Sequence, residues 1–121
     1  MKWGVREVVI KVEKRIYDPP EDSDGRRILV MTLWPRGVSK QKVDVWMKEL
    51  GTPKETMKGW KAGEITWNQF AKEYNASLKG KELLLRELSD QSKRGTVTLL
   101  CVERDYTRCH RSLLKAAIER I

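Results

Sequence analysis

The sequence predicts an α/β domain in which helices pack on a small, mostly parallel sheet of three or slightly more strands. Residues 8–17 alternate apolar and polar side chains, which is typical of a half-buried strand. Residues 27–33 and 96–102 are more continuously apolar, which is typical of buried parallel strands. Helical spacing of apolar residues precedes and follows the last run. All 121 residues fit a single domain of common size.

The connections and helices follow from local signals. Asp, Pro, Ser and Gly fill residues 18–25, so a loop joins the first two strands. This loop is shorter than a usual helical crossover, which leaves the direction of the first strand open. Apolar spacing, capping-box patterns at Thr52 and Thr66, and glycine stops mark the helices. We expect helices over residues 43–50, 53–60, 67–78, 81–94 and 106–121.

Composition favours a cytoplasmic protein with free thiols. The chain has two cysteines, Cys101 and Cys109, and its start does not resemble a signal peptide. No apolar run approaches the ~18–20 residues of a membrane span. The net charge is +8. This charge indicates either a solvated surface or attraction to a phosphorylated small molecule or a polyanion.

Polar residues follow two of the predicted strands. Trp34 and Arg36 come directly after the second strand, and Glu103, Asp105 and Arg108 come after the third. Open α/β sheets bind ligands outside the carboxyl ends of their strands, so both loops are expected to form one site. Trp34 has two interpretations, a wedge that closes the sheet edge or a platform that stacks on a base or sugar.

The start of the last helix is the strongest candidate for chemistry. Cys109, His110 and Arg111 fall in its first turn, where unpaired N–H groups and the helix dipole attract anions. We expect Cys109 to have a lowered pKa and to be the more reactive thiol, with His110 as general acid or base. Cys101 ends a buried strand and is expected to be less reactive. In the alternative interpretation, both cysteines pack inertly and His110 braces the loop above it.

Neither a metal nor another cofactor is expected. Cys101 and Cys109 are eight positions apart, and the closely spaced ligand pairs of zinc sites are missing. A phosphatase loop is also excluded, because the residue six positions after Cys101 is Thr107 rather than arginine.

Several runs resemble the family called domain of unknown function 488, and within it the YeaO-like group. The specific run is Leu33-Trp34-Pro35-Arg36-Gly37, and Cys109-His110-Arg111 matches the signature of the wider family. Further matches cover residues 14–20, 23–25, 28–30, 46–50 and 97–101. The resemblance implies an α/β fold and a set of positions, but no reaction, because the family has no established activity.

Three functions compete at this point, and the sequence does not decide whether the chain is an enzyme. The first is binding, with or without turnover, of a phosphorylated or nucleotide-like small anion at the site described above. The second is a nucleic-acid-binding module, which the charge and the aromatic residues would suit. The third is a protein-interaction or regulatory domain. The oligomeric state stays open.

Overall fold

The computed structural model describes residues 9–121, and its centre is a parallel sheet of four strands. The strands are β1 (Ile10–Lys11), β2 (Arg26–Leu29), β3 (Val45–Trp46) and β4 (Val97–Leu100). Their order is β1-β4-β2-β3, and every neighbouring pair is parallel. The α/β fold class is therefore confirmed, and the direction of the first strand is settled as parallel to β4. Val8, with which the predicted first strand began, lies outside the described residues.

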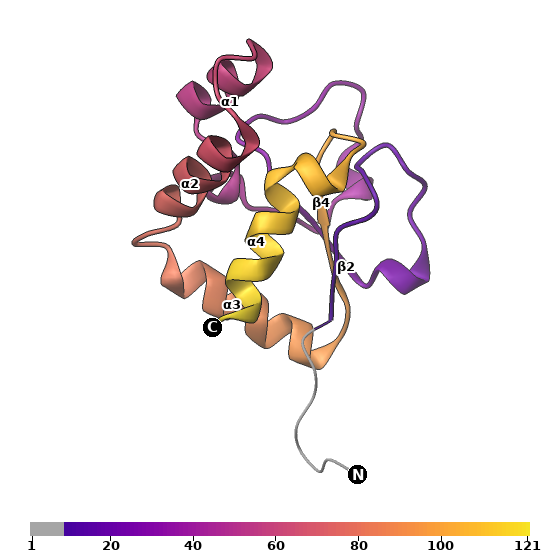
Figure 1. Ribbon diagram of the computed structural model, residues 1–121. Coiled ribbons are helices and arrows are strands. Elements are labelled where there is room, and N and C mark those ends of the chain that lie inside the picture. The colour runs from indigo at the N-terminus through magenta and orange to yellow at the C-terminus, as the bar shows by residue number, and fades with distance from the viewer. Residues whose placement is uncertain (1–8) are drawn as a thin grey trace.

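The helices gather on one side of the strands (Figure 1). They are α1 (Lys54–Lys61), α2 (Trp67–Ser77), α3 (Glu82–Arg94) and α4 (His110–Glu119). Their apolar stripes pack on Ile28, Val30 and Leu99, which point to this face of β2 and β4. Among residues 9–121, no helix is both long enough and apolar enough to cross a membrane.

The opposite face of the sheet is covered by loops. Leu29 and Leu100 alternate with the helix-facing residues and pack against Ile16 and Val38, which the loops supply. At the amino end of this face, the buried Asp24 forms ion pairs with Lys14 and Arg27 at 2.9 and 2.5 Å. These contacts hold the loops that follow β1 and β2 against the sheet.

The helix predicted over residues 43–50 is wrong. This segment contains β3, flanked by the short 3-10 turns Lys40–Lys42 and Lys48–Leu50. The main chain of the segment pairs with the edge of β2, where the Asp44 and Met47 N–H groups donate to the Arg27 and Leu29 carbonyl oxygens. These pairings satisfy the open edge of β2, which a helix cannot do. Trp46, expected in the core, is consequently exposed.

The two predicted capping boxes behave differently. Thr66 Oγ1 accepts a hydrogen bond of 3.1 Å from the Gln69 N–H group and caps α2 as expected. Thr52 does not cap α1, because Pro53 is the residue before the first turn. Thr52 Oγ1 is buried without a hydrogen-bond partner among the described residues. The capping box expected at Thr52 is therefore wrong.

Candidate thiol site at the carboxyl edge of the sheet

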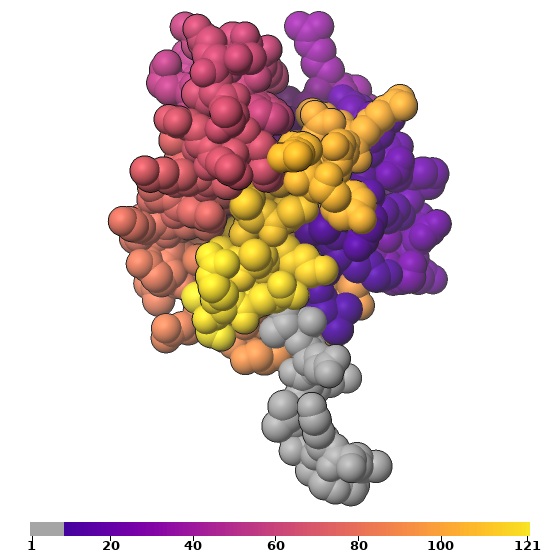
Figure 2. All heavy atoms as spheres, in the orientation of Figure 1, coloured from indigo at the N-terminus to yellow at the C-terminus, as the bar shows by residue number. Residues whose placement is uncertain are grey.

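The carboxyl ends of the central strands and the first turn of α4 meet at one place. β2 and β4 are parallel neighbours, so their following loops lie at the same edge, as the sequence predicted. The first residue of α4, His110, is tied to the end of β2, because its Nε2 lies 2.5 Å from the Val30 carbonyl oxygen. In Figure 2 the segment between β4 and α4 lies on the surface, beside the loop that follows β1.

α4 begins four residues later than the sequence predicted. Residues Tyr106–Arg108 form a separate 3-10 turn, and α4 starts at His110. Asp105 caps this turn by accepting a hydrogen bond of 3.1 Å from the Thr107 N–H group. Cys109 is therefore the residue before the helix, with extended backbone, and it is buried. The expectation that Cys109 lies within the first turn of the helix is therefore wrong.

Arg111 is buried completely, with an exposed fraction of 0%. Its Nη1 donates to the Lys14 carbonyl oxygen at 2.9 Å, and its Nη2 donates to the Glu103 carbonyl oxygen at 2.7 Å. A longer bond of 3.5 Å reaches the Cys101 carbonyl oxygen. The guanidinium thus ties together the segments that follow β1 and β4. These carbonyl oxygens draw the Arg111 side chain into the protein, and its role in binding an anion stays a prediction.

The Arg111 charge has no carboxylate partner within the described part of the chain. Its Nε is also buried without a hydrogen-bond partner among these residues. A buried cation is costly unless it is paired. The charge of Arg111 acts on two buried groups that can ionise, the thiols of Cys101 and Cys109.

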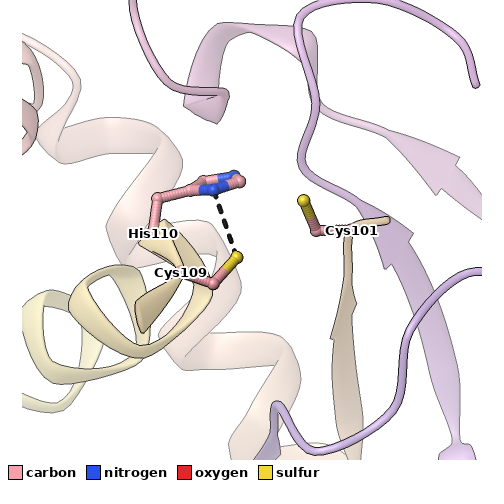
Figure 3. Close-up of side chains that lie close together, drawn as sticks. All are labelled: Cys101, Cys109 and His110. Carbon is pink, nitrogen blue, oxygen red and sulfur yellow. Dashed lines mark hydrogen bonds between the residues drawn. The ribbon is translucent and has the colours of Figure 1, made fainter. Parts of the chain in front are cut away.

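Cys101, Cys109 and His110 form a cluster next to Arg111, whose guanidinium contacts the Cys101 main chain. Their ligand-forming atoms all lie within 4.8 Å of one another, and Cys109 Sγ is 3.5 Å from His110 Nδ1. Figure 3 shows the Cys101 sulfur, from the end of β4, facing the His110 ring, with the Cys109 sulfur turned into the same space. Each cysteine is only 4% exposed.

The hydrogen bond to Val30 fixes the state of His110. A carbonyl oxygen only accepts, so Nε2 carries the proton and the neutral ring turns its Nδ1 lone pair toward Cys109. Burial lowers the pKa of His110, which favours this neutral form. The buried Tyr74 ring and the imidazole pack edge to face, with 5.3 Å between the ring centroids. His110 therefore both braces the sheet edge and presents a base to the thiols.

The two thiols have opposite pKa shifts. A hydrogen bond from Cys109 lowers the pKa of Cys101, and the charge of Arg111 acts in the same direction. The same hydrogen bond, followed by burial and the negative charge on Cys101, raises the pKa of Cys109. The expectation that Cys109 is the thiol with the lowered pKa is therefore wrong.

The donor atoms of the cluster also match those of a site for a thiophilic metal. The spacing argument against a metal considered only neighbours in the sequence, whereas the fold brings the donors together across β4 and α4. A structural zinc site takes four protein ligands, whereas a catalytic zinc site takes three and leaves one position open, so the three donors of this cluster match the second kind in number.

The remaining predicted residues lie in the loops that follow β2 and β4. Trp34 is half-buried; its Nε1 donates to the Val38 carbonyl oxygen, and it packs edge-on against Trp46. It therefore closes the sheet edge. The exposed Arg36 side chain has no partner within residues 9–121, and Arg108 lies over the Trp67 ring at 5.6 Å.

The sequence prediction missed the carbonyl oxygens that hold Arg111 and His110. Lys14, Val30 and Glu103 contribute main-chain atoms, which carry no signal in side-chain identity. Tyr74 was assigned only to the apolar stripe of α2. Its ring also supports His110, and its hydroxyl donates to the Leu50 carbonyl oxygen at 2.7 Å.

Comparison with known proteins places the chain in a family. A family model described as the active DUF488-N3 subclade matches residues 11–121. The chain belongs to this subclade.

This confirms the resemblance to the DUF488 proteins and their YeaO-like group. The uncharacterized protein YeaO of Escherichia coli (strain K12) is 38% identical over 103 residues, which cover 84% of this chain and 90% of YeaO. The uncharacterized protein Rv3073c of Mycobacterium tuberculosis (strain ATCC 25618 / H37Rv) is 31% identical over 112 residues, covering 91% and 93% of the two chains. No solved structure matches the chain.

Proposed function

We propose that this DUF488 protein binds a small phosphorylated or nucleotide-like anion at the carboxyl edge of β2 and β4, and that the Cys101 thiolate attacks it. The observation that carries the proposal is the buried Arg111, which has no carboxylate partner within residues 9–121 and lies beside a cluster of two thiols and an imidazole. The family model that matches the chain is described as active, which agrees with a chemical role.

Charge balance supports Cys101 as the nucleophile. Arg111 and the amino end of α4 both place positive charge at the end of β4. Ionisation of one thiol neutralises this charge, whereas ionisation of both would leave a buried negative charge. Cys101 carries the charge because it is the thiol whose pKa is lowered, by the Cys109 side chain beside it and by the charges of His110 and Arg111. A thiolate is the form of cysteine that acts as a nucleophile.

Cys109 and His110 are suited to proton transfer. The attack of Cys101 Sγ forms a bond to the electrophilic atom of the substrate and breaks the bond to its leaving group. The leaving group takes the proton from Cys109, whose sulfur lies 3.5 Å from His110 Nδ1. The neutral imidazole can then accept a proton from the water that releases the covalent adduct.

Exposed arginines around the cluster favour an anionic substrate. The Arg36 and Arg104 side chains make no hydrogen bond or ion pair within residues 9–121, so both are free to bind an anion. Arg108 is exposed and held over Trp67. Arginine forms paired hydrogen bonds with phosphate and carboxylate groups. Glu103 and Asp105 lie in the same loop as Arg104 and Arg108. Their negative charges would repel an anion that these arginines do not bind.

The proposal is tested with two alkylating reagents of similar size, neutral iodoacetamide and anionic iodoacetate. Cys101 should react at a pH below the ordinary cysteine pKa of about 8.5, and iodoacetate should be favoured more than with a free cysteine peptide. Arg36→Ala or Arg108→Ala should reduce that preference without changing the iodoacetamide rate. Arg86→Ala, an exposed arginine on α3, is the matched control. Inorganic phosphate should slow the alkylation of Cys101 by iodoacetate.

Three results would contradict the proposal. Alkylation that begins only when the protein unfolds would show that Cys101 is inert. An alkylation rate that rises only near the ordinary cysteine pKa would show that Cys101 is not a thiolate at lower pH. Protection by an oligonucleotide, with none by phosphate, would favour a nucleic-acid-binding module instead.

A further inference from the structure

We infer that Cys101 and Cys109 form a dithiol couple that reduces a small hydroperoxide, with Cys101 as the attacking thiol and Cys109 as the resolving thiol. The inference rests on the same Cys101 thiolate as the proposed function, but it assigns a second partner and a redox reaction to the site. The remaining observations concern the pair, the roles of its members and the size of the oxidant.

The first observation is the juxtaposition of the sulfurs. They lie within 4.8 Å of each other, face the same space, and are the only cysteine sulfurs of the chain. A disulfide brings two sulfurs to about 2 Å, so the pair must approach before it closes. Cys101 follows the last residue of β4, and Cys109 precedes the first residue of α4. Neither cysteine belongs to a strand or helix. The Cys101 carbonyl oxygen is held by the Ile16 N–H group at 2.9 Å, so the approach has to come from the side chains.

The second observation distinguishes the two thiols. The charge of Arg111 lowers the pKa of both thiols, so it does not separate them. Of the two sulfurs, that of Cys109 lies 3.5 Å from the His110 Nδ1 base. The thiol beside the base is suited to lose its proton in the second step, which leaves Cys101 to attack first.

In the first step the Cys101 thiolate attacks the terminal oxygen of the hydroperoxide and the O–O bond breaks. The alkoxide leaves as the alcohol after taking from solvent the proton that Cys101 released when it ionised. Cys101 is then a sulfenic acid. Cys109 gives its proton to His110 Nδ1 and attacks the Cys101 sulfur, so the S–S bond forms, the S–O bond breaks, and hydroxide leaves as water with that proton. Two thiols and one hydroperoxide give one disulfide, one alcohol and one water.

The third observation limits the size of the oxidant. Each cysteine is only 4% exposed, and Trp34 closes the neighbouring sheet edge. A hydroperoxide group needs to reach only one sulfur with a single oxygen atom. A protein disulfide would have to enter the same space with its own chain, so the geometry favours a small oxidant.

The test treats the full chain with hydrogen peroxide, quenches with acid and alkylates the remaining thiols before peptide mass analysis. Wild type should form an internal disulfide between residues 101 and 109. Cys109→Ser should accumulate a sulfenic acid at Cys101 that dimedone traps, and Cys101→Ser should stay reduced. Serine is nearly isosteric with cysteine, so both variants are expected to fold. The disulfide between residues 101 and 109 is sought in wild type, so this result does not depend on the folding of any variant. Dithiothreitol should return wild type to the dithiol form.

Sulfinic or sulfonic acid at Cys101 without an internal disulfide would overturn the inference, as would a disulfide that joins two chains. So would peroxide consumption by Cys101→Ser at the wild-type rate. If these results appear while Cys101 still shows thiolate alkylation and a preference for iodoacetate, the redox inference fails alone. If Cys101 is unreactive to all three reagents, the proposed function fails with it.

Discussion

Replacing Arg111 with methionine tests whether this buried cation holds the edge of the sheet together. Methionine keeps much of the length of the side chain but removes its charge and its donors. The Lys14 and Glu103 carbonyl oxygens, now bonded at 2.9 and 2.7 Å, would lose these donors in the protein interior. Cys101 would lose its neighbouring positive charge.

The magnitude follows from these contacts. A hydrogen bond from a charged donor contributes about 1.5–3 kcal/mol, so the two short bonds together account for roughly 3–6 kcal/mol. Removing the guanidinium also ends the cost of burying it, which offsets part of the loss. Breaking a buried charge pair on one side costs about 3–5 kcal/mol, and we expect a value in this range for Arg111→Met. The melting temperature should fall by roughly 10–20 °C.

Urea unfolding of wild type and three variants provides the assay. Arg108→Met removes an exposed neighbour and should cost less than about 1 kcal/mol. Arg111→Lys keeps the charge but cannot reach both carbonyl oxygens, so it should lose stability while Cys101 keeps its lowered pKa. If Arg111→Met unfolds within about 1 kcal/mol of wild type, the guanidinium does not join these segments and the reasoning is refuted.

Two further predictions concern His110 and the helix caps. Because burial lowers the pKa of His110, the unfolded chain binds a proton below pH ~6.5 that the folded protein refuses, so stability should fall as the pH decreases through this value. His110→Gln should flatten this dependence in thermal melts, and equal slopes for both proteins would contradict it. Thr66→Ala should cost about 1 kcal/mol, since Thr66 caps α2. The matched change Thr52→Val should leave the free energy of unfolding in urea unchanged, because Thr52 Oγ1 has no hydrogen-bond partner among the described residues. A loss of stability equal to that of Thr66→Ala would refute this distinction.

The sequence by itself determined the elements whose apolar pattern matches one structure. The runs that became β2 and β4 were predicted as buried and parallel, and the stripes of α2, α3 and α4 were identified from helical spacing. It also placed Trp34, Arg36 and Cys101 at the carboxyl edge of the sheet, since residues that follow parallel neighbours meet there. Family membership followed from the same residues, because motifs are a property of sequence.

Tertiary structure decided what the sequence pattern left ambiguous. Residues 43–50 have helical spacing, yet the open edge of β2 recruits them as a strand. The roles of the thiols were also reversed, because the pKa of a cysteine depends on neighbours that the fold supplies. Cys109 and Arg111 belong to one turn in the sequence, but main-chain oxygens from Lys14 and Glu103 draw Arg111 inside, where its charge faces Cys101. Such contacts join residues far apart in the chain through atoms common to every amino acid, so local patterns carry no record of them.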